Sequence, residues 1–196
     1  VKYPDKLPTG LQDYINKQIE RALKRASDFV KGEFIFRGIP AERVIEFATL
    51  SSDFILRFVA ISEISWRTQD VTALISKLFL LATQNSSMAA DLAVFGLCPD
   101  HQLKLPSIFI GLQDLFGVAS TEYQTNFIHT LYRETIVNQL STTHKREALH
   151  RLWGMLCENC WATPEPEQSF SELILNYVLR EGVIHLAKGQ QVLIAA

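Results

Sequence analysis

The stretch that most constrains the fold is residues 86–112, where two short apolar segments flank a glycine. Ser86 or Ser87 can accept hydrogen bonds from the free N–H groups that begin a helix, and Gly96 can adopt the left-handed conformation that ends one. Pro99 suits the first turn of a second helix, where its missing N–H costs nothing. The sequence therefore predicts two short helices across Gly96, as either a DNA-reading helix-turn-helix or a plain packing hairpin.

A few polar side chains of this stretch suit a contact with DNA. The predicted second helix offers His101, Gln102 and Lys104 to base edges or phosphates. Early positions of a recognition helix face the base edges, and the Gln102 amide can pair with adenine. Further cations that could reach phosphates lie elsewhere in the chain, and they are Lys24, Arg25, Lys145 and Arg146. The alternative is that these cations belong to solvated helix faces.

The length and net charge of the chain limit its possible core and its possible binding partners. A chain of 196 residues with 47% hydrophobic content can bury one sizeable core or two small ones, and we divide it at residues 1–112 and 113–196. A net charge of −2 provides no global attraction to nucleic acid, so DNA binding needs a local patch or a partner. No apolar run approaches the ~20 residues of a membrane span, and we expect a cytoplasmic protein without membrane contact.

Apolar residues recur at helical spacing along most of the chain, which predicts an all-α helical bundle. Between these segments the sequence leaves two choices open: residues 33–37 are either an edge strand or a linker, and residues 183–196 are either a β-hairpin or an apolar tail. The expected helices cover residues 11–31, two helices of a hairpin within 38–61 that meet at Ser51 and Ser52, and then 71–82, 121–140, 144–156 and 169–180, the last stopped by Gly182.

The apolar excess in residues 54–64 is larger than one buried helix face requires. Such an excess is typical of a helix that is covered on more than one side, as at a subunit interface. We therefore expect Phe54, Phe58 and Ile61 to contact a second copy of the chain or another protein.

Two pairs of metal-binding side chains invite a zinc interpretation. Cys157 and Cys160 form a C-x-x-C pair, and Cys98 and His101 form a C-x-x-H pair, which together supply the four ligands of a tetrahedral zinc site. The alternative is that the cysteines are small buried hydrophobic residues. An odd total of three cysteines favours a reducing compartment. We find no nucleophile motif, phosphate loop or paired carboxylates, and expect no enzymatic activity.

Short motifs within residues 33–112 resemble the FlhDC-like transcriptional activators encoded on integrating conjugative elements and pathogenicity islands. A glycine–isoleucine step, an acid, an apolar helix and a second apolar helix follow one another as in FlhD, and a phenylalanine–glycine–leucine turn follows as in the conjugative-element proteins. The matching segments are Phe36-Arg37-Gly38-Ile39-Pro40-Ala41-Glu42, Phe47-Ala48-Thr49-Leu50-Ser51, Leu80-Leu81-Ala82, Ser86-Ser87-Met88 and Phe95-Gly96-Leu97, with a looser echo at 149–153.

The resemblance implies a transcription activator of mobile-element or flagellar-type genes that works in an oligomer or with a second regulatory protein. Its implied partner molecules are promoter DNA and that second protein. FlhC carries a four-cysteine zinc cluster, whereas this chain has one C-x-x-C pair. A helical adaptor that makes no contact with DNA is the alternative function.

Overall fold

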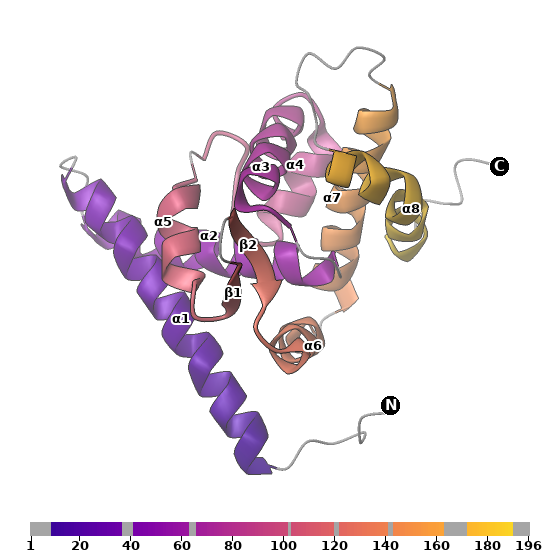
Figure 1. Cartoon of the computed structure of the whole chain (residues 1–196). Helices are drawn as coiled ribbons and strands as arrows, with labels where there is room; N and C mark the ends of the chain where they lie inside the picture. Colours follow the sequence, from indigo (N-terminus) through magenta and orange to yellow (C-terminus); the bar gives the residue numbers. More distant parts are fainter. Residues whose placement is uncertain are drawn as a thin grey trace.

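The computed structural model is predominantly helical, with one short two-stranded ribbon (Figure 1). It describes residues 9–36, 41–62, 66–101, 103–119, 122–140, 143–162 and 172–189. Within these ranges no helix is long and apolar enough to cross a membrane. The elements are α1 (Thr9–Phe36), α2 (Ala41–Ile61), α3 (Thr68–Ala82), α4 (Ser86–Ala93), α5 (Leu105–Leu112), β1 (Phe116–Ala119), β2 (Glu122–Phe127), α6 (Thr130–Gln139), α7 (Thr143–Ala162) and α8 (Glu172–Lys188).

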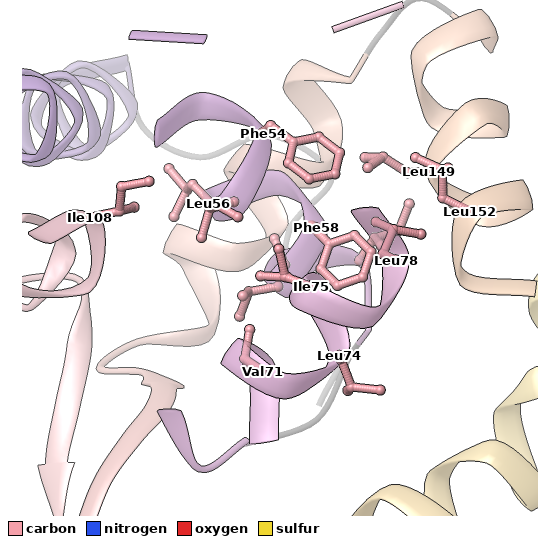
Figure 2. Packing of buried hydrophobic residues seen from close by; sticks show 14 of the residues in the cluster. Phe54, Leu56, Phe58, Val71, Leu74, Ile75, Leu78, Ile108, Leu149 and Leu152 are labelled. Carbon is pink, nitrogen blue, oxygen red and sulfur yellow. The ribbon is translucent and has the colours of Figure 1, made fainter. Parts of the chain in front are cut away.

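One hydrophobic core joins the two predicted regions of the chain. Buried side chains of α1 to α5 and of α6 to α8 belong to the same cluster. Figure 2 shows Phe54 and Phe58 of α2 close to Leu78 of α3 and to Leu149 and Leu152 of α7. Residues on both sides of position 112 therefore share a single interior.

The hairpin predicted within residues 38–61 is wrong, because α2 continues through Ser51 and Ser52. Both hydroxyl groups are buried and donate to carbonyl oxygens of the preceding turn, from Ser51 to Phe47 at 2.7 Å and from Ser52 to Ala48 at 2.8 Å. Serine favours a cap only where its side chain has a free backbone N–H to bind. Here each serine hydroxyl donates to a carbonyl oxygen of its own helix, so Ser51 and Ser52 do not end α2.

The end of α2 is buried, and side chains from distant elements take up its last carbonyl groups. The indole N–H of Trp153 donates to the carbonyl of Phe58 at 3.0 Å, and Arg133 Nε donates to that of Ala60 at 2.9 Å. Ser62 Oγ donates to the carbonyl of Val59 at 2.8 Å. Because a helix leaves its last four carbonyls without internal partners, these bonds allow α2 to end inside the protein.

The first helix is longer than the sequence predicts. α1 runs past Gly32 to Phe36, so the segment 33–37 is helical as far as the structure describes it. A side chain at Gly32 would meet nothing within 4 Å, so glycine here marks neither a turn nor a close contact. α1 packs on α2 and α5, and Gly111 of α5 allows the closest approach because a Cβ there would lie 2.1 Å from Ala26 Cα.

The helix predicted over residues 121–140 is wrong in its first half. β1 and β2 pair antiparallel with Phe116 opposite Phe127, and a regular helix begins only at Thr130. The two phenylalanine rings meet edge to face with centroids 5.0 Å apart. Aromatic and β-branched residues suit a pleated ribbon, and here they outweigh the weak helical spacing.

The last helix is also longer than predicted, because α8 passes through Gly182 and ends at Lys188. Gly182 lies against α7, where a Cβ would come within 2.9 Å of Trp161 Cζ2 and 3.0 Å of Cys157 Cβ. The glycine therefore serves close helix packing rather than helix termination. A hairpin from residue 183 is excluded as far as Gly189, and residues 190–196 lie outside the described residues.

Candidate functional site

The predicted glycine turn is present. Asn85 rather than Ser86 or Ser87 caps α4, since its Oδ1 accepts hydrogen bonds from the N–H groups of Ser87 at 3.0 Å and Met88 at 3.1 Å. Gly96 has φ +71°, in the left-handed region that glycine adopts at least cost. The first half of the predicted motif is therefore correct, with its cap one residue earlier.

The predicted second helix does not begin at Pro99. α5 begins at Leu105, and it is Pro106 that occupies the first helical turn. The N–H of Cys98 instead donates to Nδ1 of His101 at 3.1 Å, which folds this segment into a local turn. α4 packs on α3 and α7 whereas α5 packs mainly on α1, so a helix-turn-helix is not confirmed.

The side chains predicted to read DNA occupy a different setting from an open groove-binding helix. Lys104 Nζ lies 4.0 Å from Glu33 Oε2 and 5.7 Å from the centroid of the Phe34 ring, and its side chain is 17% exposed. His101 is half-buried against the ring of Phe47, and this burial lowers its pKa below 6.5. Gln102 lies outside the described residues.

The four supporting cations are divided. Arg25 binds Asp114 through Nη1 at 2.7 Å, and Lys145 lies over the ring of Phe95 at 5.7 Å from its centroid. Lys24 on α1 and Arg146 on α7 are exposed. Of the seven predicted DNA-binding residues, Lys24 and Arg146 are thus the two that are exposed and for which the described residues provide no ion pair or ring contact.

The predicted partner surface is wrong. Phe54 and Phe58 have no exposed area, and Ile61 is 4% exposed. Phe58 stacks on Trp153 with centroids 4.3 Å apart, while Phe54 meets Phe79 and the ring of Phe95. The apolar excess of this segment is therefore covered by other helices of the same chain.

The predicted zinc ligands do not converge. Cys98 is exposed beside His101, whereas Cys157 is buried between α7 and α8. Among the described residues, which include all four predicted ligands, no group of three or more His, Cys, Asp or Glu side chains could hold a metal ion. Burial raises the pKa of Cys157 to about 12, as expected for a cysteine that serves as a small core residue.

α8 has apolar side chains on two faces, and the sequence did not predict a binding surface here. Ile174, Tyr177 and Val178 are buried against the core. Another face carries three exposed apolar residues, which we call the α8 outer face: Leu175 (46% exposed), Leu179 (69%) and Val183 (59%). Ile184 (42% exposed) lies to one side of this face. Leu175, Leu179 and Val183 follow one another at intervals of four and so form one stripe. The sequence displays this spacing, but it does not show that these side chains are exposed.

A polar cluster lies beneath α8, where it packs on α7. Nδ1 of His150 and Nδ1 of His185 are 2.8 Å apart, and both side chains are buried. The Tyr177 hydroxyl hydrogen-bonds to Nε2 of His185, and the ring of Trp153 stacks on His185 with centroids 5.6 Å apart. Each of these polar atoms has its partner within the cluster, which is what burial requires of a polar group.

Burial keeps this histidine pair neutral. It is the main cause that lowers the pKa of His150 to about 4 and that of His185 to about 3, from an ordinary value of 6.5. The positive charges of Lys188 and, for His150, of Arg146 act in the same direction. The sequence shows these histidines as scattered, because 35 residues separate them.

Comparisons of the chain with protein-family models, with curated proteins and with solved structures give no match.

Proposed function

We propose that this chain is a helical protein-interaction module without enzymatic activity, which works as a subunit of a protein assembly. The observation that carries the proposal is the α8 outer face, with Leu179 69% exposed at its centre and Leu175 and Val183 one turn to either side. Contiguous exposed apolar side chains on a folded protein are typical of protein-binding surfaces. An amphipathic helix with its own apolar stripe is the kind of partner that fits a helical stripe.

The electrostatics of the α1–α5 surface support a protein partner over DNA. Lys104 is paired with Glu33, and Arg25 with Asp114. A phosphate would have to displace these carboxylates, and the net charge of −2 offers no compensating attraction. The DNA-binding activator suggested by the resemblance to FlhDC-like proteins is a second proposal, in which exposed Lys24 and Arg146 contact phosphates and a partner supplies most of the DNA contact.

A comparison of three variants in the native cells tests whether the α8 outer face binds a protein partner. We expect tagged wild-type chain to retain a protein partner that Leu179→Asp loses, because a charge in an apolar interface is costly to bury. Leu80→Asp is the matched control, since Leu80 of α3 is 62% exposed and lies outside the α8 outer face. The double variant Lys24→Ala/Arg146→Ala should keep the same partner.

Fluorescence anisotropy with mixed-sequence and promoter duplexes completes the test on the purified chain. The interaction module should show no binding at physiological salt. Under the second proposal the chain together with its retained partner would bind duplex DNA, and Lys24→Ala/Arg146→Ala would reduce the slope of log affinity against log salt by about 2, because two phosphate contacts are lost. Tight, sequence-selective binding by the chain alone would overturn the interaction module.

A further inference from the structure

The contact between α7 and α8 is built to be close and is therefore sensitive to small changes. Glycines on both helices allow it: a Cβ at Gly154 would lie 2.8 Å from the Leu186 side chain, and one at Gly189 would lie 2.9 Å from the backbone N of Arg151. The His150–His185 pair joins the two helices close to these glycine contacts. Any added charge on this buried pair is therefore held where two helices pack closely.

We propose that the His150–His185 pair is an acid-sensitive latch that holds α8 on α7. Two neutral imidazoles share one hydrogen between their Nδ1 atoms, and the Tyr177 hydroxyl completes the bonding at Nε2 of His185. If both rings are protonated, both Nδ1 atoms carry a hydrogen, and two N–H groups face each other across 2.8 Å. The doubly protonated pair therefore cannot keep the closed arrangement.

The charges around the pair oppose protonation as well. On α7 Arg146 lies one turn before His150, and on α8 Lys188 lies beside both rings. Arg151 is matched by Asp91 of α4, which is bound at 2.6 Å, and Glu147 acts on Arg151. On α8 Glu181 precedes His185 by one turn.

The remaining neighbours are aromatic or distant. Trp153, which stacks on His185, is itself covered by two rings. They are the ring of Phe58 from α2 and the indole of Trp66 just before α3. The cation of α3 that reaches α7, Lys77, acts near Cys160 at the far end of the contact. Positive charge on the pair therefore meets two cations, while the nearby Asp91 carboxylate is already bound to Arg151.

Linkage gives the sign and size of the effect. The closed state keeps both histidines neutral, whereas an opened state exposes them with ordinary pKa values near 6.5. As the pH falls below 6.5 the opened state takes up protons that the closed state refuses, so opening becomes more favourable. Between about pH 7.5 and about pH 5.5 the opening equilibrium should rise roughly 100-fold for two such groups and roughly 10-fold for one.

Cys157 is a built-in reporter of this opening, since its side chain is buried against Gly182 of α8. In the full chain with Cys98→Ser and Cys160→Ser, we measure the rate at which Cys157 reacts with a pyridyl disulfide, a reagent that labels thiols in acid. A chain that keeps only exposed Cys98 supplies the reagent's own pH dependence. We expect the corrected rate to rise roughly 100-fold over this pH range while the far-UV circular dichroism stays constant.

Histidine variants show how many histidines take up a proton when α8 opens. His150→Asn keeps an amide atom near the Nδ1 position but cannot ionise, so the rise should shrink to roughly 10-fold. His144→Asn alters an exposed histidine of the same helix and should keep the full rise. Three results would overturn the latch. The first is a labelling rate that does not change with pH in the chain with both histidines. The second is an equal loss of pH dependence in His144→Asn, and the third is a loss of circular dichroism that accompanies labelling. If His150→Asn does not fold, the slope of the wild-type rate against pH still distinguishes two protons from none.

Discussion

α2 and α8 are both apolar on more than one face, yet they use this property differently. α2 lies among α1, α5, α6 and α7, and its Phe54 and Phe58 have no exposed area. α8 lies at the edge of the molecule with α7 as its main neighbour, and Leu179 on its outer face is 69% exposed (Figure 1). An apolar excess thus shows that a helix needs a second neighbour, but not whether that neighbour belongs to the same chain.

The largest expected difference between the two helices comes from truncating a core side chain of α2. Phe58→Ala removes the ring that stacks on Trp153, and should lower the free energy of unfolding by about 3–5 kcal/mol. Urea unfolding followed by circular dichroism measures it. A loss below about 1 kcal/mol would mean that the neighbouring helices do not cover Phe58 of α2.

Closing the gap between α7 and α8 should have an intermediate effect. Gly182→Ala places a methyl group 2.9 Å from the Trp161 ring and 3.0 Å from Cys157 Cβ, and should cost about 1–3 kcal/mol of stability. Gly32→Ala in α1 is the matched control, because it meets nothing within 4 Å and should stabilise the helix by about 0.5–1 kcal/mol. The same sign for both variants in urea unfolding would show that the α7–α8 contact is looser than described.

The smallest effect is expected on the α8 outer face. Leu179→Ala should change the free energy of unfolding by less than about 0.5 kcal/mol, since the side chain is mostly in solvent already. Thermal unfolding of dilute protein, compared with Leu80→Ala, measures this difference. A loss as large as that of Phe58→Ala would place Leu179 in the core and remove the basis for a protein-binding face.

Local patterns determined the helical class and several individual features. The spacing of Val71, Leu74, Ile75 and Leu78 predicted α3, and all four side chains are buried in the structure. A glycine between two short helical segments predicts a left-handed residue, and Gly96 has φ +71°. These features depend on the chemistry of a few neighbouring residues, which the sequence displays directly.

Where two residues offered the same local property, the sequence did not choose between them. Pro99 and Pro106 both suit a first helical turn, and the structure uses Pro106 because His101 Nδ1 accepts the N–H of Cys98 and forms a turn before it. Glycine is typical of helix ends, yet α1 passes through Gly32 and α8 passes through Gly182. The free energy that decides such cases comes from contacts with distant residues.

The sequence by itself therefore determined the helical class of the protein and the apolar spacing of most of its helices. Only the tertiary structure decided which apolar face is covered, which cations are paired with carboxylates, and which histidines meet. Residues 150 and 185 share a hydrogen bond across 35 positions, and Lys104 meets Glu33 across 71, because helix packing brings together side chains that no local spacing relates. Burial and pairing are properties of those long-range contacts, and they set the charge and exposure on which function depends.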